Sequence, residues 1–318
     1  MLYNILKMSQ KQLFRHIEKL YDGRIAAIER KQYILVRGEA PIMLVAHLDT
    51  VHKEPVKTIC TSEDRNILMS PQGIGGDDRC GVFSLMSIYK DSKVKPWLLF
   101  TCDEEIGGRG AVAFCDDYAK GFLPEELADL KMIVELDRKG SDDAVYYDCD
   151  NKDFETYITS KGFRTSFGSF SDISYIAPDL GVAAVNLSCG YYNAHTQHEY
   201  ICVSDMKATI DKVLDIIEDT TCEDAPQYEY VEADYLKSYQ KSWECGGKVY
   251  YYSGSKNYSD SAAFSYVPQA IREEYIALLA YYTVSELEDI RAEMGDTGIM
   301  LLYQSECLGG YRDGQQKV

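Results

Sequence analysis

The sequence predicts an α/β fold in which a mixed, mostly parallel sheet carries helices on both faces. Apolar runs typical of buried strands recur along the chain, and segments with apolar residues at helical spacing lie between them. The expected strands are 42–46, 96–102, 132–137 and 181–188, and the main helices are 82–89, 108–118 and 203–219. Several of these strands end in histidine or acidic residues. In open α/β sheets, sites form at the carboxyl ends of strands, so this pattern predicts a site there.

The composition narrows the classes of function. A hydrophobic content of 46% in 318 residues is enough for a sizeable core, and a net charge of −18 argues against nucleic acid or an anionic membrane as the main partner. Ten cysteines without a Cys-x-x-Cys pair exclude a zinc ribbon and fit reduced thiols. The N-terminal residues show neither a signal peptide nor a transmembrane segment, so we expect a cytoplasmic protein.

The chain is expected to divide into residues 1–222, the main domain, and residues 223–318, an appendage. After Cys222 the sequence becomes rich in Tyr, Ser, Gly and acidic residues. The run 250–252 is either an edge strand or a partner surface, 269–294 is expected to be helical, and 309–318 is expected to be disordered. The appendage is expected to pack on the main domain or on another chain.

The first candidate site lies at the end of the strand 42–46. A helix over 9–21 with Ser9 as its cap and a hairpin over 24–37 are expected before it. His47 ends the strand, and a lone histidine there is often an ordinary core residue. However, Asp49 lies two residues on, on the same face, where its carboxylate can accept the second imidazole N–H and prepare the ring for a metal. His52 is expected to be a loop residue.

Two further acidic clusters follow glycine-rich or strand segments. Asp77 and Asp78 come after Gly73-Ile74-Gly75-Gly76, at the start of a helix. One of them could cap the helix, but two exceed what a cap needs, and two acids would repel a phosphate. At 103–105 three acids follow a strand. They form either a solvated loop or a site where one carboxylate binds a metal and its neighbour handles a proton.

The later part of the predicted domain adds three more acidic or histidine-bearing positions. Asp137 ends the strand 132–137. A strand over 144–150, a helix over 151–161 and an extended stretch over 163–169 should follow. Asp172 is expected to cap the next helix rather than to serve the site. The loop after the last core strand, 189–200, carries His195, His198 and Glu199.

Taken together, these residues resemble the co-catalytic zinc exopeptidases, a superfamily that includes tripeptide aminopeptidase, glutamate carboxypeptidase and aminoacylase. The resemblance covers roughly residues 8–221 and rests on five pieces in the family's order. They are His47-x-Asp49, Asp77-x-Arg79-x-Gly81, Glu104-Glu105-x-Gly107, Asp137 and His195-Thr196-x-x-Glu199.

The resemblance implies a role for each matching residue. The implied metal ligands are His47, Asp77, Glu105, Asp137 and His195. Asp77 would bridge two metals, Asp49 would orient His47, and Glu104 would be the general base. Two Zn²⁺ ions are expected, with Mn²⁺ or Co²⁺ as alternatives.

The implied activity is amide hydrolysis by an aminopeptidase. Many members of that superfamily carry an inserted lid or dimerisation domain, but only 58 residues separate Asp137 from His195 and only 30 separate His47 from Asp77, so we expect no such insert here. An alternative is an amidohydrolase that acts on N-acyl amino acids or cell-wall fragments. Another is an inactive metal-binding or interaction module. The expected substrate is a peptide or an N-acyl amino acid, and a homo-oligomer is left open.

Overall fold

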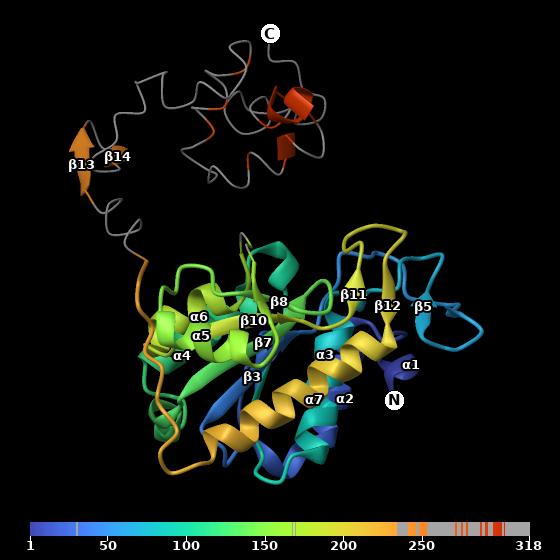
Figure 1. The fold of residues 1–318 in the computed structure, drawn as a ribbon, viewed down its shortest axis with the longest axis horizontal. Coiled ribbons are helices and arrows are strands. Elements are labelled where there is room, and N and C mark those ends of the chain that lie inside the picture. Colours follow the sequence, from blue (N-terminus) through green and yellow to red (C-terminus); the bar gives the residue numbers. More distant parts are fainter. Residues whose placement is uncertain are drawn as a thin grey trace. The chain divides into compact units, whose positions relative to one another are not determined.

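The computed structural model divides the chain into two compact units, Met1–Lys237 and Ser238–Val318. The residues that the structure describes are 1–233 except 30, 167 and 169, then 241–245, 248–252, 271, 275, 278, 287, 290, 291, 295–300 and 302. The described residues of the first unit form one body with no inserted domain (Figure 1). The domain boundary at residue 222 remains a prediction. Beyond it, Tyr228 is buried and stacks on Tyr157 of the first unit.

An eight-stranded mixed sheet organises the first unit (Figure 1). Its spatial order is β1 (Ile25–Glu29), β2 (Tyr33–Val36), β6 (Trp97–Thr101), β3 (Ile42–His47), β7 (Met132–Arg138), β10 (Ala184–Ser188), β8 (Asp143–Val145) and β9 (Arg164–Thr165). The four adjacent strands β6, β3, β7 and β10 are parallel, whereas β1 pairs with β2, β2 with β6 and β8 with β10 in antiparallel fashion. The carboxyl ends of the central strands therefore meet at one edge.

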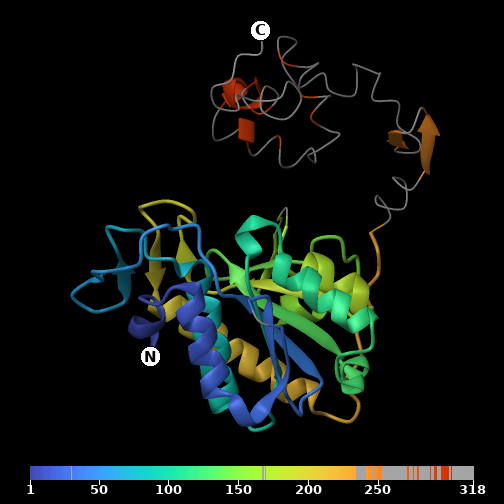
Figure 2. The same cartoon turned by 180° about the vertical axis from the view of Figure 1, so that it is seen from behind.

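Helices cover both faces of this sheet, as predicted (Figures 1 and 2). The helices are α1 (Leu2–Ile5), α2 (Gln10–Leu20), α3 (Gly76–Asp91), α4 (Arg109–Ala119), α5 (Lys152–Ser160), α6 (Ile173–Leu180) and α7 (Val203–Thr220), with short 3₁₀ turns η1 (Asp22–Arg24), η2 (Glu104–Ile106) and η3 (Glu125–Asp129). Alternate residues of β3 enter two separate cores. Leu44 and Ala46 pack with α2, α3, α5 and α7, whereas Met43 and Val45 pack with α4 and α6. This alternation follows from the two-residue period of a strand.

A second sheet was not predicted, because its strands are too short to produce a periodic pattern. It has four strands in the order β11 (Tyr191–Tyr192), β12 (Tyr200–Cys202), β5 (Ile67–Met69) and β4 (Cys60–Thr61). Strands β12 and β5 pair in antiparallel fashion, so the loop 193–199 is anchored to a distant part of the chain.

Several expected elements are confirmed and two are shorter than predicted. The Ser9 side chain caps α2 in a reciprocal arrangement with Gln12, and β1 and β2 form the expected hairpin. The strand expected at 144–150 ends at Val145, because the chain turns there and the Cys149 N–H bonds to the Tyr146 carbonyl. Among the described residues of the extended stretch over 163–169, strand is confined to Arg164–Thr165.

The described residues of the second unit include a hairpin and a small core. Strands β13 (Lys241–Cys245) and β14 (Lys248–Tyr252) pair in antiparallel fashion, so the tyrosine run 250–252 is part of a strand. The buried residues are Ile271, Tyr275, Leu278, Leu287 and Ile299. The stretch 309–318, expected to be disordered, lies outside the described residues. No described helix has the length and apolar character needed to cross a membrane.

Candidate metal centre

His47 stands at the carboxyl end of β3 with its imidazole fully buried. Its Nδ1 lies 3.2 Å from Asp49 Oδ1, so the side chain two residues on contacts the ring as the spacing predicted. Asp49 also accepts hydrogen bonds from the backbone N–H groups of Glu104 (3.1 Å) and Glu105 (3.0 Å). One carboxylate therefore fixes both the orientation of the imidazole and the turn that carries two further acids.

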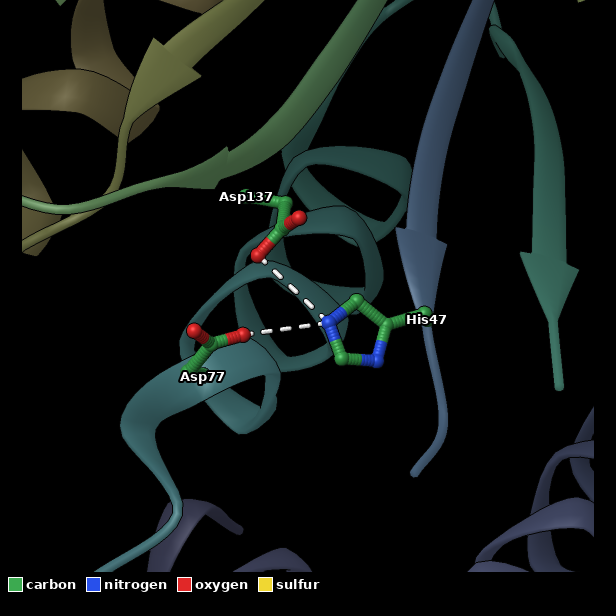
Figure 3. Close-up of side chains that lie close together, drawn as sticks. All are labelled: His47, Asp77 and Asp137. Atoms are coloured by element: carbon green, nitrogen blue, oxygen red, sulfur yellow. Dashed lines mark hydrogen bonds and ion pairs between the residues drawn. The ribbon is translucent and has the colours of Figure 1, made fainter. Parts of the chain in front are cut away.

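The two acids at the start of α3 have different environments. Asp77 points toward the ring of His47, with Oδ1 3.1 Å from Nε2 (Figure 3). Asp78 is fully buried and accepts a hydrogen bond from the Gly81 N–H at 2.8 Å. Because the backbone is non-helical at Asp77 and Asp78, this bond caps the regular part of α3 that follows them. Gly81 is required by space, because a Cβ there would lie 2.0 Å from the Leu136 carbonyl oxygen. Asp78 therefore fits the cap interpretation, and Asp77 fits the site interpretation.

Asp137 lies near the ring of His47, and His195 lies near the second oxygen of Asp77. Asp137, near the end of β7, has Oδ1 3.5 Å from His47 Nε2 (Figure 3). The Tyr191 hydroxyl donates to the same Asp137 oxygen at 3.2 Å. His195 has Nε2 3.1 Å from Asp77 Oδ2 and 3.2 Å from Glu105 Oε2. Residues as far apart in sequence as 47 and 195 therefore meet at the carboxyl edge of the sheet.

Within the described residues, these side chains form two groups with potential metal ligands. His47, Asp77 and Asp137 make one group, and Asp77, Glu105 and His195 make the other, with the donor atoms of each within 4.8 Å of one another. Asp77 belongs to both groups, because Oδ1 faces His47 and Oδ2 faces His195. Imidazole nitrogens and carboxylate oxygens are donors that bind Zn²⁺ and related divalent cations. Glu105 Oε1 is buried and has no hydrogen-bond partner. Coordination to a cation would compensate for this. The donor set therefore fits divalent metal ions.

The charges around these groups are strongly coupled. Burial, then the charge of Asp77, raises the pKa of Asp137 to about 7. Burial raises the pKa of Glu104 to about 9, with Asp137 adding to the effect. Burial alone would lower the pKa of His47, but the surrounding carboxylates, Asp137 first, raise it well above its ordinary value. Crowded, desolvated carboxylates of this kind gain most from a bound cation.

Glu104 occupies a separate position beside both groups. Its Oε2 lies 4.0 Å from His47 Nε2, its side chain is buried, and it is a member of neither candidate ligand group. Its neighbour Glu105 faces His195 instead. Glu104 therefore lies near His47 and Glu105 near His195. This arrangement is compatible with the separate roles that the resemblance implies for the two acids.

Two buried acids behind the site were missed or misinterpreted from the sequence. Asp172 does not cap α6: its side chain makes no capping hydrogen bond and instead accepts one from the Thr101 hydroxyl in the interior. Burial raises the pKa of Asp172 to about 6. Glu135, fully buried in β7, accepts a hydrogen bond from the Ser171 hydroxyl. Glu135 could have been noticed from the sequence, because it is an acidic residue inside the otherwise apolar strand 132–137.

Two further side chains, those of Arg79 and His52, support the loops around the site. Arg79, almost completely buried, donates to the carbonyl oxygens of Leu48 and Met8, so it fastens the segment after His47. Burial lowers the pKa of Arg79 to about 10. His52, expected in a loop, lies in one but pairs with Glu199 at 2.7 Å.

Comparison with known proteins shows a fold shared with solved structures. No protein-family model matches the sequence, and no curated protein matches it. Among solved structures, aminopeptidase PepT from Bacillus cereus ATCC 10987 is 14% identical with a TM-score of 0.53, covering 70% of this chain and 97% of that one. Aminopeptidase APDkam598 from the archaeon Desulfurococcus kamchatkensis is 13% identical with a TM-score of 0.51, covering 68% and 93%.

A TET aminopeptidase from the marine sediment archaeon Thaumarchaeota archaeon SCGC AB-539-E09 is also similar. It is 12% identical with a TM-score of 0.51, and the match covers 67% of this chain and 93% of that one. These similarities show that the chain has the α/β fold of solved aminopeptidases. The predicted resemblance is confirmed at the level of the fold.

Proposed function

We propose that the protein is a metal-dependent hydrolase of peptide bonds, most specifically an aminopeptidase. The observation that carries the proposal is Asp77, whose two carboxylate oxygens each face a different histidine. A carboxylate shared in this way by two groups of ligand atoms is the arrangement of a two-metal hydrolytic site. The fold shared with solved aminopeptidases supports the same class of reaction.

The chain's own residues would hold two metal ions. His47, Asp77 and Asp137 would bind one, and Asp77, Glu105 and His195 would bind the other. Zn²⁺ suits these donors best, with Mn²⁺ and Co²⁺ as alternatives. Such ions would lower the pKa of a water molecule and polarise the scissile carbonyl.

Glu104 is proposed as the general base. It would take a proton from the attacking water and pass it to the leaving amine. Its position supports this role, because Asp49 fixes its backbone N–H while its carboxylate stays outside both ligand groups. A carboxylate bound to a metal would have lost the free oxygen that accepts the proton.

The choice of an aminopeptidase rests on the architecture of the first unit. The absence of an inserted domain among residues 1–233 supports the same choice. The oligomeric state stays a prediction.

The decisive experiment combines metal analysis with hydrolysis assays. Protein purified without chelator should contain about two zinc, manganese or cobalt ions per chain by mass spectrometry, and Asp77→Ala should lose both. Glu104→Gln should keep its metal and lose a factor of about 10²–10⁴ in kcat on aminoacyl nitroanilides. Asp103→Asn is the matched control, because it changes the preceding acid of the same turn (φ 59°) to a residue that tolerates that backbone.

Each outcome separates the alternatives. Absence of metal in the wild type, even after incubation with zinc, would refute the proposal. Hydrolysis of N-acetyl amino acids but not of aminoacyl nitroanilides would replace the aminopeptidase by an amidohydrolase with the same metal site. Full activity of Glu104→Gln would remove Glu104 as the base.

A further inference from the structure

Another buried carboxylate, that of Glu199, contacts the loop that carries Asp77. Its Oε1 accepts a hydrogen bond from the Asp77 N–H at 2.9 Å, and its Oε2 accepts one from the Gly75 N–H, also at 2.9 Å. The same Oε2 lies 2.7 Å from His52 Nε2. Glu199 is fully buried, yet it belongs to neither candidate ligand group among the described residues.

We infer that Glu199, supported by His52, is a positioning residue that holds Asp77 where it can serve both metal ions. The inference rests on the proposed two-metal function and deepens it by assigning residues that are neither ligands nor base. A buried carboxylate is costly unless hydrogen bonds compensate for its lost solvation. For Glu199 these hydrogen bonds come from the backbone N–H groups of Gly75 and Asp77. If the loop that presents Asp77 changed its conformation, Glu199 would lose these bonds and its burial would become unfavourable.

The local backbone is shaped for this contact. A Cβ at Gly76 would lie 2.7 Å from Tyr191 Cβ and 3.3 Å from Glu199 Oε1. Only glycine therefore lets the chain pass close enough for the N–H groups on both sides of it to reach one carboxylate. This explains Gly76 without invoking a bound phosphate.

Glu199 also joins the two halves of the site. It ends the loop that carries His195, and β12 follows directly, paired with β5. Through Glu199 this loop is attached to residues 75–77, more than 120 positions earlier in the sequence. Because both oxygens of Asp77 face histidines, a shift of its backbone would weaken both ligand groups together.

His52 completes the arrangement from the other side. Its side chain is only 12% exposed, and Gly73 lies against the ring so closely that a Cβ there would meet it at 2.2 Å. The imidazole therefore has little freedom to turn away from Glu199. Its contribution is smaller than that of Glu199, because it contacts the carboxylate but not the Asp77 loop's N–H groups.

Glu199→Gln and His52→Phe test the inference by zinc binding rather than by activity alone. Glutamine has one acceptor oxygen, so its NH₂ group must face either the Gly75 or the Asp77 N–H. Calorimetric titration of Zn²⁺ into chelator-treated protein should show binding weakened about 10–100-fold in Glu199→Gln, with both binding steps affected, and less in His52→Phe. The matched controls are Glu223→Gln and His198→Phe, which change exposed residues and should bind zinc as the wild type does.

A second readout separates positioning from catalysis. At saturating zinc, Glu199→Gln should recover a kcat close to that of the wild type, whereas Glu104→Gln should not. Circular dichroism checks that Glu199→Gln is folded. If the folded variant binds zinc with wild-type affinity, the inference is overturned. If the glutamine variant fails to fold, wild-type zinc affinity in His52→Phe would overturn it instead. A wild type that binds no zinc would instead overturn the proposed function on which the inference rests.

Discussion

The replacement of Asp49 by asparagine tests how the site is built, because one carboxylate there accepts three hydrogen bonds. Oδ1 receives those of His47 Nδ1 (3.2 Å) and the Glu104 N–H (3.1 Å), and Oδ2 receives that of the Glu105 N–H (3.0 Å). Asparagine has the same shape but only one acceptor oxygen. In either orientation of the amide, at least one donor faces an NH₂ group instead of an oxygen.

The structure sets the size of the expected loss. A hydrogen bond to a charged group contributes about 1.5–3 kcal/mol, and a buried donor left without a partner costs about 1–3 kcal/mol more. Asp49 is only 9% exposed, so water cannot replace the missing acceptor easily. We therefore expect the free energy of unfolding of Asp49→Asn to fall by about 3 kcal/mol, and its zinc affinity to fall about 10–100-fold because His47 loses its orientation.

Urea unfolding of the chelator-treated proteins, followed by circular dichroism, measures the first quantity. Asp64→Asn is the matched control, because Asp64 also accepts hydrogen bonds from one side chain and one backbone N–H but at an exposed site, where the midpoint should not move. An Asp49→Asn variant that unfolds at the same urea concentration as the wild type would refute the reasoning.

The pH dependence supplies an independent check on the same variant. Burial alone would raise the pKa of Asp49, but the hydrogen bond from His47 and those from the backbone hold it below its ordinary value of 3.8. A carboxyl whose pKa is lower in the folded state stabilises the protein above its unfolded-state value and loses this contribution as the pH falls. The difference between wild type and Asp49→Asn should therefore shrink below pH 3.8.

Three further expectations follow from other parts of the molecule. Because the pKa of Asp137 is raised from 3.8 to about 7, the metal-free folded protein binds more protons between these pH values than the unfolded chain does. Its free energy of unfolding, measured by urea titration, should therefore fall as the pH rises from 4 to 7. A rise would contradict the buried environment of Asp137. A chain that ends at residue 237 should keep its zinc stoichiometry and hydrolysis, since both ligand groups lie in the first unit, and loss of zinc on truncation would show that the second unit is needed. Under native conditions a thiol reagent should label Cys60 and Cys222 and spare the six buried cysteines that the structure describes, as read by peptide mass spectrometry; equal labelling before and after denaturation would contradict that burial.

The strand ends were predictable because their signals are local. The apolar runs that end at His47 and Asp137 are long enough to mark buried strands, and the two-residue spacing of His47 and Asp49 places both side chains on one face. These features need no knowledge of the rest of the fold. The roles assigned to the side chains stay predictions, although the structure brings them together.

The errors arose where a distant partner decides the outcome. Asp172 has the residue type and position of a helix cap, but Thr101, 71 residues earlier, attracts its side chain inward. The four-stranded sheet depends on pairing between 67–69 and 200–202, and strands of two or three residues leave no periodic pattern. For the same reason the contact between His52 and Glu199 could not be foreseen, since 147 positions separate them.

The order of the proposed metal ligands along the chain has a consequence for synthesis in the cell. Asp137 completes the first group of proposed ligands, and His195 completes the second group near the end of the first unit. At a translation rate of about 5–20 residues per second, the 58 positions from 137 to 195 take about 3–12 s. A nascent chain can therefore present the complete first group before the second group is complete. Stable uptake of both metal ions would mark the moment at which this unit is complete.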